Sequence, residues 1–229
     1  MSRSTAARWL CRRGRFLQPD VLSLNEYVHG DSRVELLTEL TSAGLRHVLI
    51  SNRLNGNNQV LVASRFPLAA GELQGPQSRD QGGESNFLHV RVPSHDLEFV
   101  GLRAPAYSSE DLRVYWDGLM EIMRGCAKRR IVFMGDFNAD PDQQRRSTGK
   151  HLRSLREEGW HIPSPAGEWS YISTRAAGTR IDHIVTSQHL RVERAEYVSK
   201  IESLELASPN KMARVSDQAP LVAQLGQLA

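Results

Sequence analysis

The stretch VFMGDFNADPD (Val132–Asp142) places an apolar run directly before three acids and an amide. A short run of β-branched and aromatic residues followed by turn-forming residues is typical of a buried strand. The oxygens at the end of this strand have two interpretations. They cap a turn, as Asp and Asn side chains do well, or they bind a cation and a phosphate. Acids elsewhere in the chain help to decide between the two.

A calcium-binding loop is one form of the cation interpretation, because Asp136, Asn138 and Asp140 have the one-three-five spacing that opens such a loop. That loop needs a glycine at its sixth position, where Pro141 stands, and a glutamate at its twelfth, where Ser147 stands. The sequence therefore excludes a calcium loop of this type.

Three further acids end or begin other predicted strands. Glu26 stands near the end of LSLNEY, Asp182 stands in TRIDHIV, and Asp217 precedes the apolar residues of VSDQAPL. If these strands converge, Glu26 and Asp217 offer hard oxygen ligands to Mg²⁺ or Mn²⁺. Asp136 would then lie near a metal-bound phosphate, as the base that activates water.

Five segments in this order resemble the endonuclease/exonuclease/phosphatase superfamily. They are PDVLSLNEY (Pro19–Tyr27), QVLVASRFPL (Gln59–Leu68), GDFN (Gly135–Asn138), RIDHI (Arg180–Ile184) and SDQAPL (Ser216–Leu221). The resemblance runs from about residue 19 to residue 225 and implies a DNase I-like fold. That fold is a four-layer α/β sandwich, in which two packed mixed β-sheets are flanked by helices.

The resemblance also implies a role for each acid and for the amide. Glu26 binds the divalent cation, and Asp217 is a second carboxylate on the metal side. Asp136 orients or deprotonates the attacking water, and Asn138 donates a hydrogen bond to the phosphate. Asp182 orients the histidine that in relatives touches the scissile phosphate.

Arg103, in GLRAPAY, stands two residues before Pro105, where relatives place a tyrosine or a histidine that touches the phosphate. An arginine at this position can clamp a phosphate oxygen, with Tyr107 as a further contact. The alternative is a solvated cation at the end of a strand.

Gln218 stands where the family has its catalytic histidine. Glutamine can still donate a hydrogen bond to a phosphate oxygen, but it is uncharged and cannot shuttle a proton near neutral pH. A general acid–base group contributes on the order of 10²–10⁴ to a rate, so we expect an impaired enzyme.

The N-terminal residues depart from the family pattern as well. Relatives begin with a strand that ends in an asparagine, whereas this chain begins MSRSTAARWLC, inside a predicted amphipathic helix. The five arginines and absent acids of its first nineteen residues are also the composition of a transit peptide. We expect either that the true start lies upstream or that a core strand is missing, which would expose sheet edges.

Length and composition fit one α/β domain over residues 1–229. The hydrophobic fraction is 40%, and no apolar run approaches the length of a membrane span. Cys11 and Cys126 are too few for a disulfide framework, which favours a reducing cytoplasm. A monomer is the default expectation.

The positive charge consists mainly of arginine. The lysines are Lys128, Lys150, Lys200 and Lys211, so 25 of the 29 cationic residues are arginines, and the pI is about 9.1. Arginine suits bidentate phosphate contacts, although a GC-rich genome would produce the same bias. The sequence thus favours a Mg²⁺-dependent nuclease impaired by Gln218. The alternatives are an inactive relative that binds phosphate or nucleic acid, and a small-molecule or lipid phosphatase.

Periodicity predicts three further helices and several strands. The helices lie at about residues 32–43, 109–124 and 147–158, with Ser32 and Glu35 as a capping box at the start of the first. Strands are predicted at about 47–51, 59–64, 86–92, 97–103, 169–172, 180–185, 195–199 and 220–223, with a surface loop over 68–84.

Overall fold

The larger of the two main sheets has five strands. The computed structural model describes residues 17–52, 58–77, 85–106, 110–143, 148–173, 178–210 and 214–226. The sheet order is β4-β5-β6-β7-β8, and only β6 and β7 run parallel. The strands are β4 (Ala69–Ala70), β5 (Phe87–Val92), β6 (Leu97–Arg103), β7 (Ile131–Asp136) and β8 (Asp182–Thr186). Because parallel neighbours need a crossover, helix α3 (Glu110–Gly125) connects β6 to β7.

The facing sheet has three antiparallel strands in the order β1-β3-β2, namely β1 (Val21–Tyr27), β3 (Gln59–Ser64) and β2 (His47–Ile50). Beside it, β9 (Arg191–Tyr197) pairs with β12 (Leu221–Gly226), and β10 (Lys200–Ile201) pairs with β11 (Leu204–Glu205). Within the described residues, β1 pairs with β3 alone and β12 pairs with β9 alone. The helix predicted for the N-terminal residues stays a prediction, since residues 1–16 lie outside this description.

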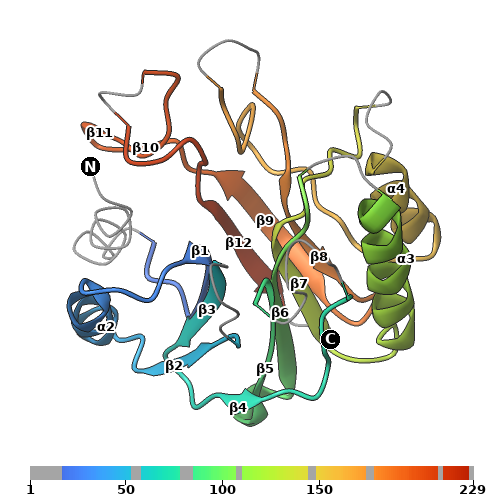
Figure 1. The fold of residues 1–229 in the computed structure, drawn as a ribbon, viewed down its shortest axis with the longest axis horizontal. Coiled ribbons are helices and arrows are strands. Elements are labelled where there is room, and N and C mark those ends of the chain that lie inside the picture. Colours follow the sequence, from blue (N-terminus) through green and yellow to red (C-terminus); the bar gives the residue numbers. More distant parts are fainter. Residues whose placement is uncertain are drawn as a thin grey trace.

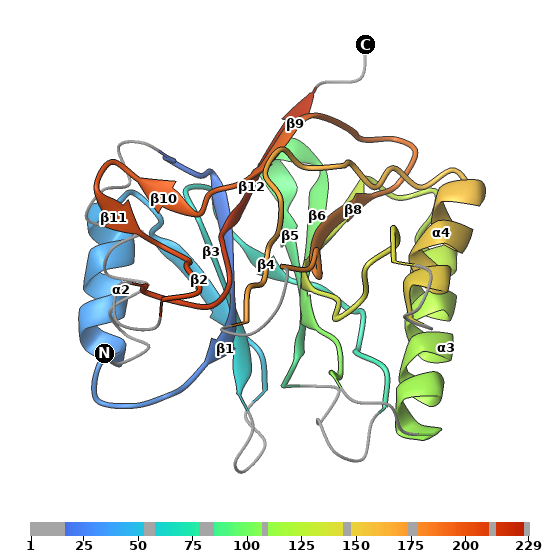
Figure 2. The ribbon, with the colours of Figure 1, turned by 90° about the horizontal axis from the view of Figure 1, so that it is seen from above.

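The elements stack in four layers. Helix α2 (Arg33–Ser42) covers the outer face of the three-stranded sheet, and α3 with α4 (Gly149–Glu157) covers the outer face of the five-stranded sheet (Figure 2). The two sheets lie face to face between these helices (Figures 1 and 2). The predicted sandwich is therefore confirmed.

Each interface between layers has its own apolar cluster. Phe133, Trp116 and Leu152 belong to the cluster between the five-stranded sheet and its helices, and Leu40 and Leu61 belong to the cluster under α2. The cluster between the sheets contains mainly valines, together with Phe99, Ile184, Leu190 and Ala195. Alternating strand residues supply these faces, because successive side chains of a strand point to opposite sides.

The helices and most strands lie within a few residues of their predicted positions, but three local predictions were wrong. The predicted surface loop over 68–84 begins with the short strand β4, which pairs with β5. The Ser32 side chain makes no capping hydrogen bond, so the capping box does not form. The segment from Trp169 to Ile172 forms isolated bridges at Tyr171 rather than a strand. No helix in the described part of the chain has the length and apolar character needed to cross a membrane.

Candidate active site

Three of the predicted site residues lie side by side at one end of the five-stranded sheet. The strand register pairs Arg103 of β6 with Asp136 of β7, and Asp136 with Asp182 of β8. Residues directly opposite each other on neighbouring strands project on the same side of a sheet. The distance from Arg103 Nε to Asp136 Oδ2 is 4.0 Å. The register alone therefore brings a cation and two acids together.

Glu26 joins this row from the facing sheet, because β1 packs across β6 and β7. The β1–β3 register shifts between Leu24 and Tyr27, and Glu26 within the shift adopts a left-handed φ of 56°. A bulge of this kind re-aims a side chain at the end of a strand. Arg103 Nη2 lies 3.0 Å from Glu26 Oε1, so the guanidinium contacts acids of both sheets.

Gly135 allows the chain to turn immediately before Asp136. Its φ is 138°, and a Cβ at this position would lie 2.1 Å from the carbonyl oxygen of Leu102 and 2.8 Å from the side-chain amide of Asn25. Only glycine adopts this backbone region without strain.

Replacing Gly135 with alanine is therefore expected to lower the free energy of unfolding by about 1–3 kcal/mol from backbone strain, with the contact to Leu102 adding to this cost. Urea denaturation followed by circular dichroism measures the change. Gly125→Ala at the end of α3 is the matched control, because a Cβ there would meet nothing within 4 Å. Equal stability of the two variants would contradict the prediction.

The carboxyl group of Asp136 is almost fully buried, with 3% of the residue exposed. Burial raises its pKa to about 6, although hydrogen bonding from the Asn138 N–H (2.8 Å) and the charge of Arg103 oppose the rise. Gln218 Nε2 also donates to Asp136 Oδ2, at 3.3 Å. Asp136 can therefore gain and lose a proton near neutral pH.

Asp182 is the second buried acid of the row. Burial raises its pKa well above the ordinary range, and the neighbouring charge of Asp136 raises it further. Its Oδ2 is buried and has no hydrogen-bond partner among the described residues. The family resemblance pairs this acid with a histidine in relatives; in this structure its neighbour is Asp136, which is a like charge when both acids are ionised.

Asn138 and Asp140 occupy the turn after β7. Asn138 has a φ of 46°, and its side-chain amide donates to the carbonyl oxygen of Ala104 at 2.7 Å. Asp140 Oδ1 accepts from the N–H of Asp142 at 3.0 Å, and its Oδ2 accepts from the N–H of Arg180 at 3.2 Å. Turn capping thus describes Asp140 well, while Asp136 both caps the turn and faces the other acids.

Asp217 and Gln218 enter from the segment before β12. The backbone carbonyl of Asp217 accepts from Ile172 at 3.0 Å, and its half-exposed carboxylate lies 3.5 Å from Arg214 Nη2. Gln218 forms an isolated bridge with Tyr171. Tyr107 lies outside the described residues, so its predicted contact with substrate stays a prediction.

Ser170 fixes two parts of this site, yet no pattern in the sequence singles it out. Its buried hydroxyl oxygen accepts from the N–H groups of Ile181 (2.9 Å) and Asp182 (3.0 Å). Its carbonyl oxygen accepts from the N–H of Ala219 at 2.7 Å, beside Gln218. Ser170 therefore positions Asp182 and Gln218 relative to each other.

Ser170→Ala removes the acceptor of both N–H groups, and we expect it to lower the free energy of unfolding by about 1–3 kcal/mol. Ser94→Ala, at an exposed position, serves as the control. Chemical denaturation of both variants tests this expectation, which fails if they lose the same stability. Ser170→Thr, which keeps the hydroxyl, is expected to retain most of the lost stability.

His183 supports the other side of the site. It is buried, and its Nε2 lies 2.7 Å from the carbonyl oxygen of Ala139 and 3.1 Å from that of Arg180. Because carbonyl oxygens only accept, Nε2 carries the proton in the neutral ring. The ring also packs edge-on against Phe137. A histidine directly after Asp182 is visible in the sequence, but its buried partners are not.

Burial lowers the pKa of His183, although its two carbonyl partners and Asp140 oppose the shift. The unfolded chain then binds more protons than the folded protein, so this group costs stability as the pH falls below about 6.5. We expect the urea midpoint of the wild type to fall more steeply between pH 7.5 and 5.5 than that of His183→Gln. His29→Gln, at an exposed histidine, should retain the wild-type slope.

The oxygen donors at this end of the sheets fit a hard divalent cation. Glu26 and Asp217 offer carboxylates, although with Asp136 they do not bring three ligand atoms within 4.8 Å of one another in the described part of the chain. The side-chain oxygen of Asn25 is buried with no hydrogen-bond partner among the described residues. Carboxylate and amide oxygens are the ligands that Mg²⁺ and Mn²⁺ prefer.

A second cluster, formed by Glu72, His89 and Glu98, brings three candidate ligand atoms within 4.8 Å of one another. Arg129 lies between its acids, with Nε 2.8 Å from Glu98 and Nη1 2.7 Å from Glu72. His89 contacts Glu98 through Nε2 at 2.7 Å and accepts the N–H of Leu73 through Nδ1 at 3.1 Å. These contacts make the cluster an internal ion-pair network rather than a cation site.

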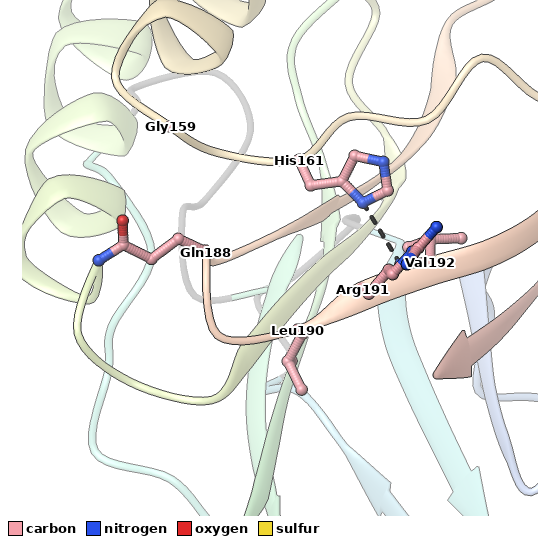
Figure 3. A pocket seen from close by; sticks show the side chains of 6 residues that line it. All are labelled: Gly159, His161, Gln188, Leu190, Arg191 and Val192. Carbon is pink, nitrogen blue, oxygen red and sulfur yellow. Dashed lines mark hydrogen bonds between the residues drawn. The ribbon is translucent and has the colours of Figure 1, made fainter. Parts of the chain in front are cut away.

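A pocket of about 410 Å³ opens elsewhere, next to the Thr186 end of β8, where His161 bridges to Thr186. Figure 3 shows the residues that line it. The pocket is lined by Gly159, His161, Gln188, Leu190, Arg191 and Val192. His161 Nδ1 accepts the N–H of Val192 at 3.3 Å (Figure 3). The pocket shares no residue with the row of acids.

Comparison with known proteins agrees with this architecture. The chain matches the model of the Endonuclease/Exonuclease/phosphatase family over residues 3–217. No curated protein sequence matches it.

Solved structures with the same fold include two of NExo from Neisseria. One is the 3′ phosphatase NExo bound to a product DNA hairpin (17% identity, TM-score 0.69, 95% of each chain covered). The other is the 3′–5′ exonuclease NExo from Neisseria meningitidis (18% identity, TM-score 0.67, 97% of this chain and 96% of that chain covered). A mannosyl-6-phosphatase from Bacteroides thetaiotaomicron is also similar (13% identity, TM-score 0.65, 98% and 92% covered).

At these identities the structural likeness establishes the fold, and the family model establishes the membership. The chain belongs to the endonuclease/exonuclease/phosphatase family, whose members are phosphoric-ester hydrolases.

Proposed function

We propose that this protein is a Mg²⁺- or Mn²⁺-dependent phosphodiester hydrolase that acts on nucleic acid, with activity reduced by Gln218. The observation that carries the proposal is the row Arg103–Asp136–Asp182, set by strand register and joined by Glu26 from the facing sheet. A buried acid poised near neutral pH beside a guanidinium suits in-line attack of water on phosphorus.

In this proposal Asp136 takes the proton of the attacking water. Its pKa of about 6 leaves most of it ionised at neutral pH and still basic enough to accept a proton. Arg103 neutralises charge on the phosphate as the transition state forms. The Asn138 amide carries two N–H groups, so one can donate to phosphate while the other holds the carbonyl of Ala104.

Glu26 and Asp217 are the proposed cation ligands. When bound, the divalent ion supplies Lewis-acid polarisation of a phosphoryl oxygen. The buried oxygen of Asn25, one residue before Glu26, is a further candidate donor to the same ion.

Gln218 accounts for the proposed impairment. Gln218 can hold Asp136 or a phosphate oxygen, but it cannot deliver a proton to the leaving group. In this proposal Asp182 has no imidazolium to orient, so it cannot make up for the missing proton donor.

A nucleic-acid substrate is supported by the basic pI of about 9.1 and by the excess of arginine. One structural neighbour is itself bound to a DNA hairpin. The proposed protein is a monomer in a reducing cytoplasm, consistent with Cys126 as a buried free thiol. The mannosyl-6-phosphatase neighbour supports a small phosphomonoester as the second candidate substrate.

The test is metal-dependent hydrolysis across a panel of substrates. Supercoiled plasmid, single-stranded DNA, abasic duplex DNA, a 3′-phosphorylated duplex and mannose 6-phosphate are each incubated with Mg²⁺, with Mn²⁺ or with EDTA. Cleavage of a DNA substrate that requires the metal and Asp136 supports the proposal. Hydrolysis of the sugar phosphate alone would favour the second candidate, and binding of DNA without cleavage by any variant would favour an inactive relative.

A further inference from the structure

The pocket beside β9 lies outside the row of acids and has the size of a ligand site. Its lining residues come from two short segments, 159–161 and 188–192 (Figure 3). Its volume of about 410 Å³ falls within the range of roughly 300–1,000 Å³ that is typical of ligand pockets. The pocket therefore has room for a small organic molecule.

His161 offers this pocket one ring N–H. Its main chain is held by the end of β8, because His161 and Thr186 exchange two backbone hydrogen bonds of 3.0 and 2.9 Å. Its Nδ1 accepts the N–H of Val192 at 3.3 Å, so in the neutral ring the proton is on Nε2. Nε2 has no hydrogen-bond partner among the described residues and is reached by solvent. It is a donor in a fixed place.

Arg191 offers a guanidinium group with free donors. Its side chain is exposed and makes no hydrogen bond or ion pair within the described part of the chain. Acids near the pocket in sequence are engaged elsewhere, because Glu193 accepts the side-chain amide of Gln224 at 3.1 Å and Glu158 pairs with Arg124 at 2.6 Å. No lining residue is acidic.

The charge around His161 is positive. Burial lowers the pKa of its ring, and the positive charge of Arg191 lowers it further. No carboxylate of the described residues opposes these two causes. The ring and the guanidinium are therefore close enough for their charges to repel, and an anion between them would favour the charged form of both.

Phosphate matches these donors better than a carboxylate does. Two parallel N–H groups of a guanidinium satisfy both oxygens of a carboxylate, whereas a phosphate has a further oxygen for a third donor. His161 Nε2 is that third donor. Gln188 stands on the other side of the pocket from His161 and Arg191 (Figure 3), and its amide can both donate and accept.

We propose that this pocket binds a small phosphorylated molecule, with its phosphate between Arg191 and His161 Nε2 and its organic part beside Gln188. This phosphate is separate from the scissile one, because the pocket lies next to the Thr186 end of β8 and Asp182 begins the strand at its other end. The inference does not depend on the proposed function.

The experiment follows the imidazole of His161 by nuclear magnetic resonance while inorganic phosphate is added, against sodium chloride at equal ionic strength. The pKa of His161 is measured with and without phosphate in the wild type, Arg191→Gln and Arg194→Gln. Arg194 is the matched control, because it is an exposed arginine of the same strand and pairs with Glu196 at 2.8 Å. Acetate, added in the same way, tests a carboxylate in place of phosphate.

Phosphate should raise the pKa of His161 in the wild type by about one unit, because a bound anion favours the charged imidazolium. Arg191→Gln should raise this pKa in the absence of phosphate, since it removes the repulsion, and should lose most of the phosphate effect. Arg194→Gln should keep the wild-type effect. Acetate should produce a smaller shift than phosphate.

Three results would overturn the proposal. They are an absent phosphate shift in the wild type, an equal shift in Arg191→Gln, and a response of the exposed His29 ring as large as that of His161. An acetate shift as large as the phosphate shift would overturn the assignment to a phosphorylated ligand. None of these results bears on the proposed function, because the pocket shares no residue with the row of acids.

Discussion

Asp136→Asn is expected to lower the rate of metal-dependent phosphoester hydrolysis by about 10²–10⁴-fold, because it removes the proposed base and keeps the shape of the side chain. The measurement is kcat and KM on whichever substrate of the panel the wild type hydrolyses. Since the amide cannot accept a proton from water, the loss should fall on kcat.

The same substitution is expected to leave the protein at least as stable as the wild type. Burial raises the pKa of Asp136 to about 6, so at pH 7.5 the folded state holds a carboxylate in an unfavourable environment. Proton binding and folding are linked, so an acid whose pKa is raised on folding lowers the free energy of unfolding at any pH above that pKa. A neutral side chain removes this penalty, together with the repulsion of Asp182.

Asp142→Asn is the matched control for Asp136→Asn, because it makes the same chemical change at an exposed position of the same loop. It should retain the wild-type rate. Equal rates for wild type and Asp136→Asn would contradict the role of Asp136, and an unfolded Asp136→Asn protein would contradict the interpretation of its raised pKa.

Gln218→His is expected to raise the rate of metal-dependent phosphoester hydrolysis by about 10²-fold. This is the second largest effect that we predict. Gln218 Nε2 lies 3.3 Å from Asp136 Oδ2, so an imidazole at this position would reach the row of acids. A histidine can carry a proton near neutral pH, whereas glutamine cannot. The added cation would also stabilise the ionised forms of Asp136 and Asp182, whose pKa values burial now raises.

The measurement is kcat as a function of pH for the wild type, Gln218→His and Gln224→His. Gln224 lies on β12 and is exposed, so the control makes the same substitution away from the site. Gln218→His should introduce a new ionisation into the pH profile, and Gln224→His should not. If Gln218→His and the wild type are equally inactive on every substrate, the interpretation as an inactive phosphate-binding relative gains support.

Much of the fold could be predicted because its signals are local. Apolar runs that end in Glu26 and Asp136 indicate buried strands with acids at their ends, and α3 has the apolar periodicity of a helix on a sheet. The order of the segments that contain these acids also identifies the family. The predictions of a capping box at Ser32 and of a strand at Trp169 were wrong. Ser32 has φ −77° and ψ 0°, outside the β-region backbone typical of a capping residue, and Tyr171 makes only isolated bridges, to Thr179 and Gln218.

The candidate site could be predicted only as a set of residue types. Ser170 and His183 escaped the sequence analysis because their partners are backbone groups brought near by folding. The hydroxyl of Ser170 meets residues 181 and 182, and the ring of His183 meets the carbonyl of Ala139, 44 positions away. No spacing rule in a sequence reports such contacts.

The sequence by itself determined which acids stand at the ends of strands and which family these residues resemble. Only the tertiary structure decided that Arg103 lies between Glu26 and Asp136, and that burial brings the pKa of Asp136 to about 6. The physical reason is that the charge state of a side chain depends on how much water folding removes from it and on which charged groups folding brings near it. Those neighbours come from strands far apart in the chain, and only their pairing sets the distances.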